Sequence, residues 1–96
     1  MPKLPEVVRG AITDYRIVHR KHKTRAGRIK IYGKGGAIIE INPDMSYDLQ
    51  IATLVHELLH ACDEETGGGL KEREVDRISV AWVALYRRNG WKLPGQ

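Results

Sequence analysis

The residues His56-Glu57-Leu58-Leu59-His60 form an H-E-x-x-H pattern, which has a direct chemical meaning. On an α-helix, two His that are four positions apart share one face and can hold one metal ion. A glutamate beside the first His can act as general base on a water that the metal holds. We therefore predict a zinc site at His56 and His60, with Glu57 as the catalytic base.

The residues around this motif divide between two sides of a helix. At about 100° per residue, His60 lies about 40° from His56, and Glu57 lies about 100° from it. The apolar residues lie on the other side, at about 140° to 300°: Ile51, Leu54, Val55, Leu58, Leu59 and Cys62. Such a division suits a helix that lines a cleft. Cys62, the only cysteine, points about 160° away from His60, so we expect a small buried thiol rather than a ligand.

A catalytic zinc usually has three protein ligands and one water, so the His pair needs a third donor. The candidate acids are Asp63, Glu72, Glu74 and Asp76. In a helix that begins near these last three, Glu72 and Asp76 lie one turn apart, whereas Glu74 lies about 160° from Glu72. We predict Glu72 as the ligand, with Asp63 and then Glu74 as alternatives. Asp76 is expected to accept the free ring N–H of a ligand His and so to orient that ring.

Three segments before the motif are predicted to be strands: residues 11–18, 28–32 and 37–41. Residues 26–27 and 33–36 contain the glycines of the intervening turns. Because the connections are short, we expect an antiparallel three-stranded meander.

Two helices are predicted after the strands. Ser46 is the expected N-cap of a helix from Tyr47 to about Asp63, and Gly67-Gly68-Gly69 must end it. A second helix is expected from about Lys71 to Arg88, closed by Asn89-Gly90. Its apolar stripe is expected to pack against the protein and comprises Val75, Ile78, Trp82, Leu85 and Tyr86. The chain is thus predicted to be one α+β domain over residues 1–96.

The composition is that of a small globular domain. With 42% hydrophobic and 29% charged residues, the 96-residue chain can bury one modest core. It has no apolar run of bilayer length and no signal-like start, so we expect a cytoplasmic protein without membrane contact. The single cysteine fits a reducing compartment.

The net charge of +4 is concentrated in one segment, since Arg16 to Lys30 contains seven Lys or Arg and no acid. A second hypothesis is therefore a nucleic-acid-binding module that uses the segment from His19 to Lys30. Its candidate contacts are Arg20, Lys21, Lys23 and Arg25. A solvated basic loop is the simpler interpretation.

The His motif and the acids after it resemble the gluzincin pattern, H-E-x-x-H followed by E-x-x-x-D, with Glu72 and Asp76 at the acidic positions. Metzincins are less similar, because Asp63 and Thr66 stand where they have Gly and a third His.

From about Tyr15 to Asn89, the chain resembles very small phage-type metallopeptidases related to the ImmA/IrrE family. In that family a G-x-I strand, an apolar strand and T-L-x-H-E-x-x-H precede an acidic helix start. Gly27 to Ile29, residues 37–41, and Thr53 to His60 follow this order. At the second helix, members of that family more often have E-x-E-A-x-x-F-A. Here Val75 stands at the first alanine position, and Ile78-Ser79 stand at the Phe-Ala positions.

This resemblance implies a minimal zincin fold that acts on a protein or peptide, in the host cytoplasm if it is phage-encoded. It implies zinc at His56, His60 and Glu72, with Glu57 as base.

Some features of such a site stay open at this point. Manganese or iron could occupy the same donors. Tyr47, His19 or His22 could stabilise the oxyanion, and the strand at 37–41 could bind an extended substrate by strand addition.

A third hypothesis is a structural zinc site in an interaction protein, closed by Asp63 beside Glu72. The sequence does not indicate an oligomeric state.

Overall fold

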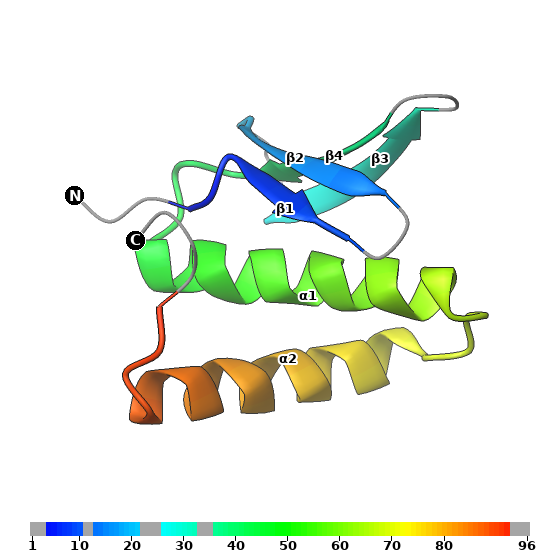
Figure 1. Cartoon of the computed structure of the whole chain (residues 1–96). Coiled ribbons are helices and arrows are strands. Elements are labelled where there is room, and N and C mark those ends of the chain that lie inside the picture. Colours follow the sequence, from blue (N-terminus) through cyan, green and yellow to red (C-terminus); the bar gives the residue numbers. More distant parts are fainter. Residues whose placement is uncertain (1–3, 11–12, 22–25, 33–35, 93–96) are drawn as a thin grey trace.

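The computed structural model describes residues 4–10, 13–21, 26–32 and 36–92 and arranges them in layers (Figure 1). A four-stranded sheet covers one side of helix α1 (Tyr47–Glu65), and helix α2 (Glu72–Arg88) runs along the other side. The main core cluster joins the sheet, α1 and Val83 of α2. The predicted α+β class is therefore confirmed, and no helix in the described part of the chain has the length and apolarity to cross a bilayer.

The predicted antiparallel meander of three strands is wrong in its topology. The strands are β1 (Val7–Arg9), β2 (Asp14–His19), β3 (Gly27–Tyr32) and β4 (Gly36–Ile41), in the order β1-β2-β4-β3. β1 was not predicted, and it pairs antiparallel with β2. β2 pairs in parallel with β4, and β3 pairs antiparallel with β4 at the edge of the sheet.

The side chains of β3 and β4 explain this order. Ala37, Ile39 and Ile41 of β4 are buried, so the strand suits the interior of the sheet. β3 alternates apolar residues with Arg28 and Lys30, and charged residues are typical of an edge strand. The short connections led us to predict that strands adjacent in the sequence are also adjacent in the sheet. The observed order instead places β4, the most apolar strand, in the interior of the sheet.

Helix α1 begins where its capping signal predicted. Ser46 is the N-cap, and its Oγ accepts a hydrogen bond from the Leu49 N–H at 3.2 Å. Ile51, Leu54, Val55 and Ala61 are buried within the core cluster. The prediction of a buried Cys62 is wrong, because this thiol is exposed. The helical period predicts the side of the helix on which a residue lies. It does not predict whether a neighbouring element extends far enough along the helix to cover that residue.

Helix α2 ends as predicted, but it is rotated relative to the prediction. Gly90 has φ +66°, and the Trp91 N–H donates to the Tyr86 carbonyl at 3.1 Å, which closes the helix. The buried residues are Val75, Ser79, Val83 and Tyr86. Ile78, Trp82 and Leu85 of the predicted packed stripe are exposed. The observed rotation instead turns Glu72 and Asp76 toward the His pair on α1.

Gly27 allows β3 to lie directly against α1. A Cβ at this position would lie 2.5 Å from the Glu40 carbonyl oxygen and 2.7 Å from Cγ2 of Thr53. No larger residue fits without movement of the strand or the helix, because backbone atoms form one of the two contacts. Gly27 therefore sets the distance between the strand edge and the helix that carries the His pair.

We predict that Gly27→Ala lowers the free energy of unfolding by about 1–3 kcal/mol, the usual cost of overpacking. Denaturant unfolding would measure the change. Thr53→Ser removes the Cγ2 methyl but retains a hydroxyl for the hydrogen bond to the Leu49 carbonyl, so it should restore part of the loss. Unchanged stability in Gly27→Ala would contradict the close packing of β3 on α1.

Tyr15 connects β2 to the last turn of α1. Its ring is buried, and its hydroxyl donates a hydrogen bond to Glu65 Oε1 at 2.7 Å. Burial, and then this hydrogen bond, raise the pKa of Tyr15 from 10.0 to about 12. The folded state therefore favours the neutral phenol.

The stabilisation that Tyr15 provides should be complete below pH 10 and decrease as the pH rises to about 12, since the unfolded phenol ionises first. Tyr15→Phe should cost about 0.5–1.5 kcal/mol near neutral pH, the value of one hydrogen bond. The difference between wild type and Tyr15→Phe in denaturant unfolding should shrink across this range. A constant difference up to pH 12 would contradict the assigned hydrogen bond.

Candidate metal centre

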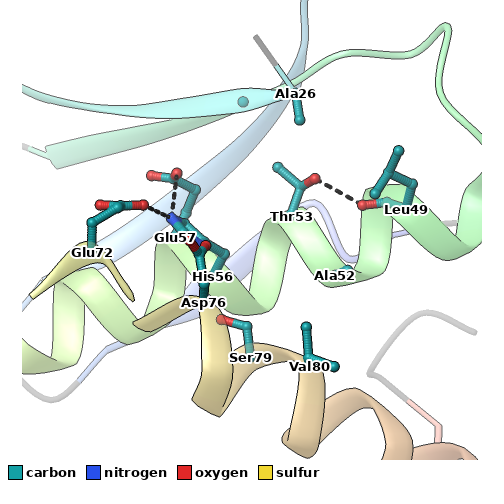
Figure 2. A pocket seen from close by; sticks show the side chains of 11 residues that line it. Ala26, Leu49, Ala52, Thr53, His56, Glu57, Glu72, Asp76, Ser79 and Val80 are labelled. Atoms are coloured by element: carbon teal, nitrogen blue, oxygen red, sulfur yellow. Dashed lines mark hydrogen bonds and ion pairs between the residues drawn. The ribbon is translucent and has the colours of Figure 1, made fainter. Parts of the chain in front are cut away.

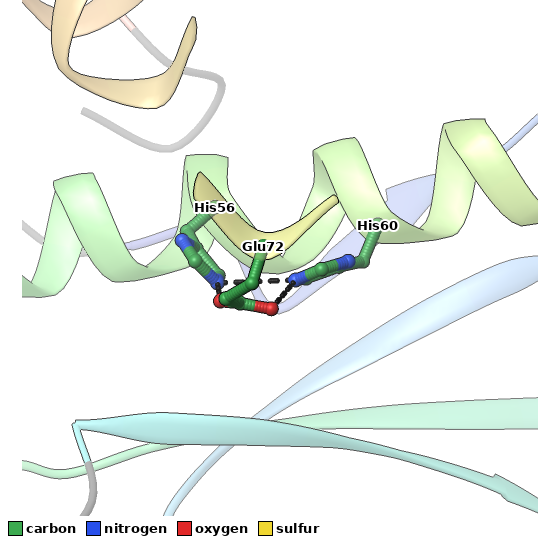
Figure 3. A group of neighbouring side chains, drawn as sticks. All are labelled: His56, His60 and Glu72. Carbon is green, nitrogen blue, oxygen red and sulfur yellow. Dashed lines mark hydrogen bonds and ion pairs between the residues drawn. The ribbon is translucent and has the colours of Figure 1, made fainter. Parts of the chain in front are cut away.

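One carboxylate from α2 bridges the two imidazoles of α1 (Figure 3). Oε1 of Glu72 lies 2.7 Å from Nε2 of His56, and Oε2 lies 2.9 Å from Nε2 of His60. The two Nε2 atoms are 3.2 Å apart. The structure thus brings together the three side chains that the sequence analysis predicted as ligands, although they lie on two helices.

The loop between the helices places Glu72 opposite the His pair. Gly67, Gly68 and Gly69 all have positive φ, so the chain can reverse direction here at low steric cost. The Asp63 carboxylate accepts the Leu70 N–H, with an oxygen at 3.2 Å, and so holds the end of the loop. α2 then begins at Glu72, in the turn that faces the His pair.

The two alternative third ligands have structural roles in the described chain. Asp63 holds the Leu70 N–H, and Oε1 of Glu74 accepts the Lys71 N–H at 2.9 Å in a capping box. Neither belongs to the group of donors that could hold a metal. The geometry therefore favours Glu72 over both alternatives.

Asp76 lies on the far side of the His56 ring from Glu72. Its Oδ1 is 2.9 Å from Nδ1 of His56, which leaves Nε2 directed at Glu72. A carboxylate in this position fixes the orientation of the ring. Glu72 and Asp76 can contact the same ring because they are one helical turn apart.

Glu57 and the His pair line a cleft between α1 and the edge of the sheet. The Glu57 side chain is only 13% exposed, and its Oε1 lies 4.0 Å from Nε2 of His56. Figure 2 shows Glu57 and Glu72 directed toward His56. The cleft continues past these residues into a cavity of about 690 Å³, lined in part by Ala26, Leu49, Ala52, Thr53, Ser79 and Val80. A space of this size can accommodate peptide side chains.

The distances between donor atoms fit a tetrahedral metal ion. Bonds of about 2.1 Å to zinc place neighbouring ligand atoms roughly 3.4 Å apart. The two Nε2 atoms are 3.2 Å apart, and with one oxygen of Glu72 the three ligand atoms lie within 4.8 Å of one another, so small side-chain movements would admit the ion. Two imidazole nitrogens and one carboxylate are also a ligand set typical of catalytic zinc.

From the sequence, strand addition was assigned to residues 37–41, and no role was predicted for the edge of β3. Gly27 and Ile29 of β3 line the cleft together with Glu57 and the His pair. The signal was present in the alternating pattern of β3, which indicates an edge strand, but the predicted meander placed this strand in the centre.

The predicted oxyanion donors lie elsewhere or outside the described residues. His19 contacts Oε1 of Gln50 at 3.1 Å, and it does not line the cleft. Burial raises the pKa of Tyr47, which packs against the core cluster and does not line the cleft either. His22 lies outside the described residues.

The predicted nucleic-acid contacts are either paired with acids or not described. NH1 of Arg20 lies 2.9 Å from Oε2 of the buried Glu40, and Nζ of Lys21 lies 3.8 Å from Oδ1 of Asp44. Lys23 and Arg25 lie outside the described residues. In the described part of the segment from His19 to Lys30, Arg20, Lys21 and Arg28 therefore lie beside carboxylates.

The chain matches no protein-family model, no curated protein and no solved structure.

We predict that the protein binds one zinc ion and that Glu72→Gln weakens this binding strongly. Asp76→Asn should lower the zinc affinity by about 10–100-fold, the usual effect of losing the partner of a ligand His. Calorimetric titration with zinc would measure both. Glu74→Gln is the matched control, because this residue is in the same helical turn but directs its carboxylate to Lys71. Equal zinc affinity in Glu72→Gln and Glu74→Gln would contradict the site.

Proposed function

We propose that this protein is a zinc-dependent metallopeptidase of the very small phage-type kind, related to the ImmA/IrrE family. The observation that carries the proposal is the bridge from the Glu72 carboxylate to both Nε2 atoms of the H-E-x-x-H helix. We further propose that the protein acts in the cytoplasm, which is the host cytoplasm if a phage encodes it.

In this proposal His56, His60 and Glu72 hold zinc, and Asp76 fixes the ring of His56. When bound, zinc polarises a water molecule and the carbonyl of the substrate. The described residues contribute three donors, and Asp63, which would close a structural site, is engaged with Leu70. An arrangement with three protein ligands suits catalysis, since a catalytic site keeps a position for water.

Glu57 is the proposed general base. Its carboxylate shares the cleft with both His side chains and is largely shielded from solvent. A carboxylate there can accept a proton from the attacking water and deliver it to the amine that leaves. His56 and His60 cannot take this role while their Nε2 atoms bind the metal.

The edge of β3 is the proposed binding site for an extended substrate. The strand at 37–41 was predicted for this role, but it is β4, which is paired on both sides. The Asn42 N–H donates to the Ala26 carbonyl, so Ala26 directs its hydrogen-bonding groups toward β4. In an antiparallel ladder the direction alternates, and Gly27 and Ile29 therefore present their backbone N–H and C=O groups to the open edge. A peptide can add there as a further strand beside the His pair.

The nucleic-acid alternative receives less support from the described residues. Glu40 holds Arg20 and also Arg28, whose Nε is 2.5 Å from Oε1. Phosphate contacts would have to compete with this buried carboxylate. We therefore do not extend the proposed function to nucleic-acid binding.

We predict that Glu57→Gln retains zinc but loses about 10²–10⁴-fold in the rate of peptide hydrolysis, since the amide cannot accept the proton. Mass spectrometry of a diverse peptide mixture would detect the products. Removal of zinc by a chelator should abolish cleavage by the wild type, and added zinc should restore it. Glu74→Gln is the control, because it also removes one negative charge but lies outside the proposed catalytic residues. Wild-type rates in Glu57→Gln would overturn the assignment of the base.

A further inference from the structure

Helix α2 has a second apolar face that no described element covers. This outer face of α2 consists of Ile78, Trp82 and Leu85, joined by Trp91 just after the helix. Their exposed fractions are 42%, 43%, 46% and 49%. The rings of Trp82 and Trp91 contact each other, with centroids 6.1 Å apart. A contiguous group of large exposed apolar side chains is typical of an interaction surface.

The outer face points away from the rest of the molecule. Val75, Val83 and Tyr86 are buried on the side of α2 that faces α1, and α2 forms an outer layer (Figure 1). Ile78, Trp82 and Leu85 are separated by four and then three positions. This spacing is that of the contact positions in a pair of packed helices.

The charges beside this face select the partner. Glu74 lies in the first turn of α2, and Arg88 lies in the last turn. Ala81 lies seven residues after Glu74 and seven residues before Arg88. Because seven residues make two helical turns, all three lie along one flank of the outer face. Ser79 and Tyr86 lie on the opposite flank. They are buried within the chain, so this flank is not open to a partner.

A second α2 in antiparallel orientation complements these charges. In antiparallel helix pairs, the same flanks of the two helices meet. Glu74 would face Arg88 of the other copy, and the reverse, while the small Ala81 lies at the centre and allows close approach. Ile78 would then pack against Leu85 of the other copy. Glu74 accepts the Lys71 N–H through Oε1, and a carboxylate has capacity for a further partner.

We propose that the outer face of α2 binds the outer face of a second copy, and that the protein is a two-fold symmetric dimer. Such an interface uses the same surface on both chains, and a self-complementary charge pattern favours this arrangement over an unrelated partner. The inference is independent of the metal site, because none of the contact residues is a proposed ligand or the proposed base.

Sedimentation measured over a range of concentrations would test the dimer, and fluorescence offers a second readout. Both tryptophans of the chain lie on the outer face, so their emission should shift to shorter wavelength as the dimer forms. A protein that remains monomeric up to roughly 1 mM, where even weak pairs associate, would overturn the proposal.

Two matched substitutions test the location of the interface. Leu85→Asp should raise the dissociation constant at least about 100-fold, because it places a charge in the contact. Val80→Asp is the control, since Val80 is 70% exposed on the same helix but about 160° from Ile78. It should leave the dissociation constant unchanged. Circular dichroism would verify the fold of both, and equal effects of the two would contradict the assigned face.

A charge exchange tests the antiparallel orientation. Glu74→Lys and Arg88→Glu should each weaken the dimer by about tenfold, because each places like charges opposite one another. The double variant restores opposite charges and should recover the affinity. Any loss of the Glu74 cap persists in the double variant, so recovery reports the pairing between copies. Additive weakening in the double variant would overturn the orientation.

Discussion

The contact between one carboxylate and two imidazoles organises this small protein. Glu72 reaches from α2 to His56 and His60 of α1, and Asp76 fixes the first ring from the same helix. The side chains of Glu72 and Asp76 are 65% and 61% exposed, so these contacts lie at the margin of the interface between the helices. Ser79 is buried on the same side of α2, with its hydroxyl donating to the Val75 carbonyl, while larger apolar residues remain outside. The side of α2 that faces α1 therefore carries the polar contacts of the site as well as the apolar packing of Val75 and Val83.

Features that depend on short stretches of chain could be predicted from the sequence. The Ser46 cap, the end of α2 at Asn89-Gly90 and the grouping of His56 with His60 follow from local hydrogen bonding and the helical period. The proximity of Glu72 required only one further step, because the three glycines end α1 and allow the chain to reverse direction before α2 begins. This is why the candidate donors were easier to identify than the sheet.

Features that depend on distant contacts could not be predicted in the same way. The parallel pairing of β2 with β4 joins segments separated by all of β3, and no local pattern specifies it. β1 has only three residues, too few for a clear periodic signal. Cys62 shares a helical side with buried residues, yet it is exposed near the end of α1, where burial depends on the extent of the neighbouring elements.

The three-glycine loop has a consequence for how the helices stay together. Such a loop loses much conformational entropy when the chain folds, and α2 contributes only a narrow apolar strip to α1. An ion held by side chains of both helices would bind the docked arrangement and not the separated one, so its binding energy would favour docking. Occupancy of the proposed site would then also regulate tertiary structure, and depletion of the ion would release α2 before it affected the sheet.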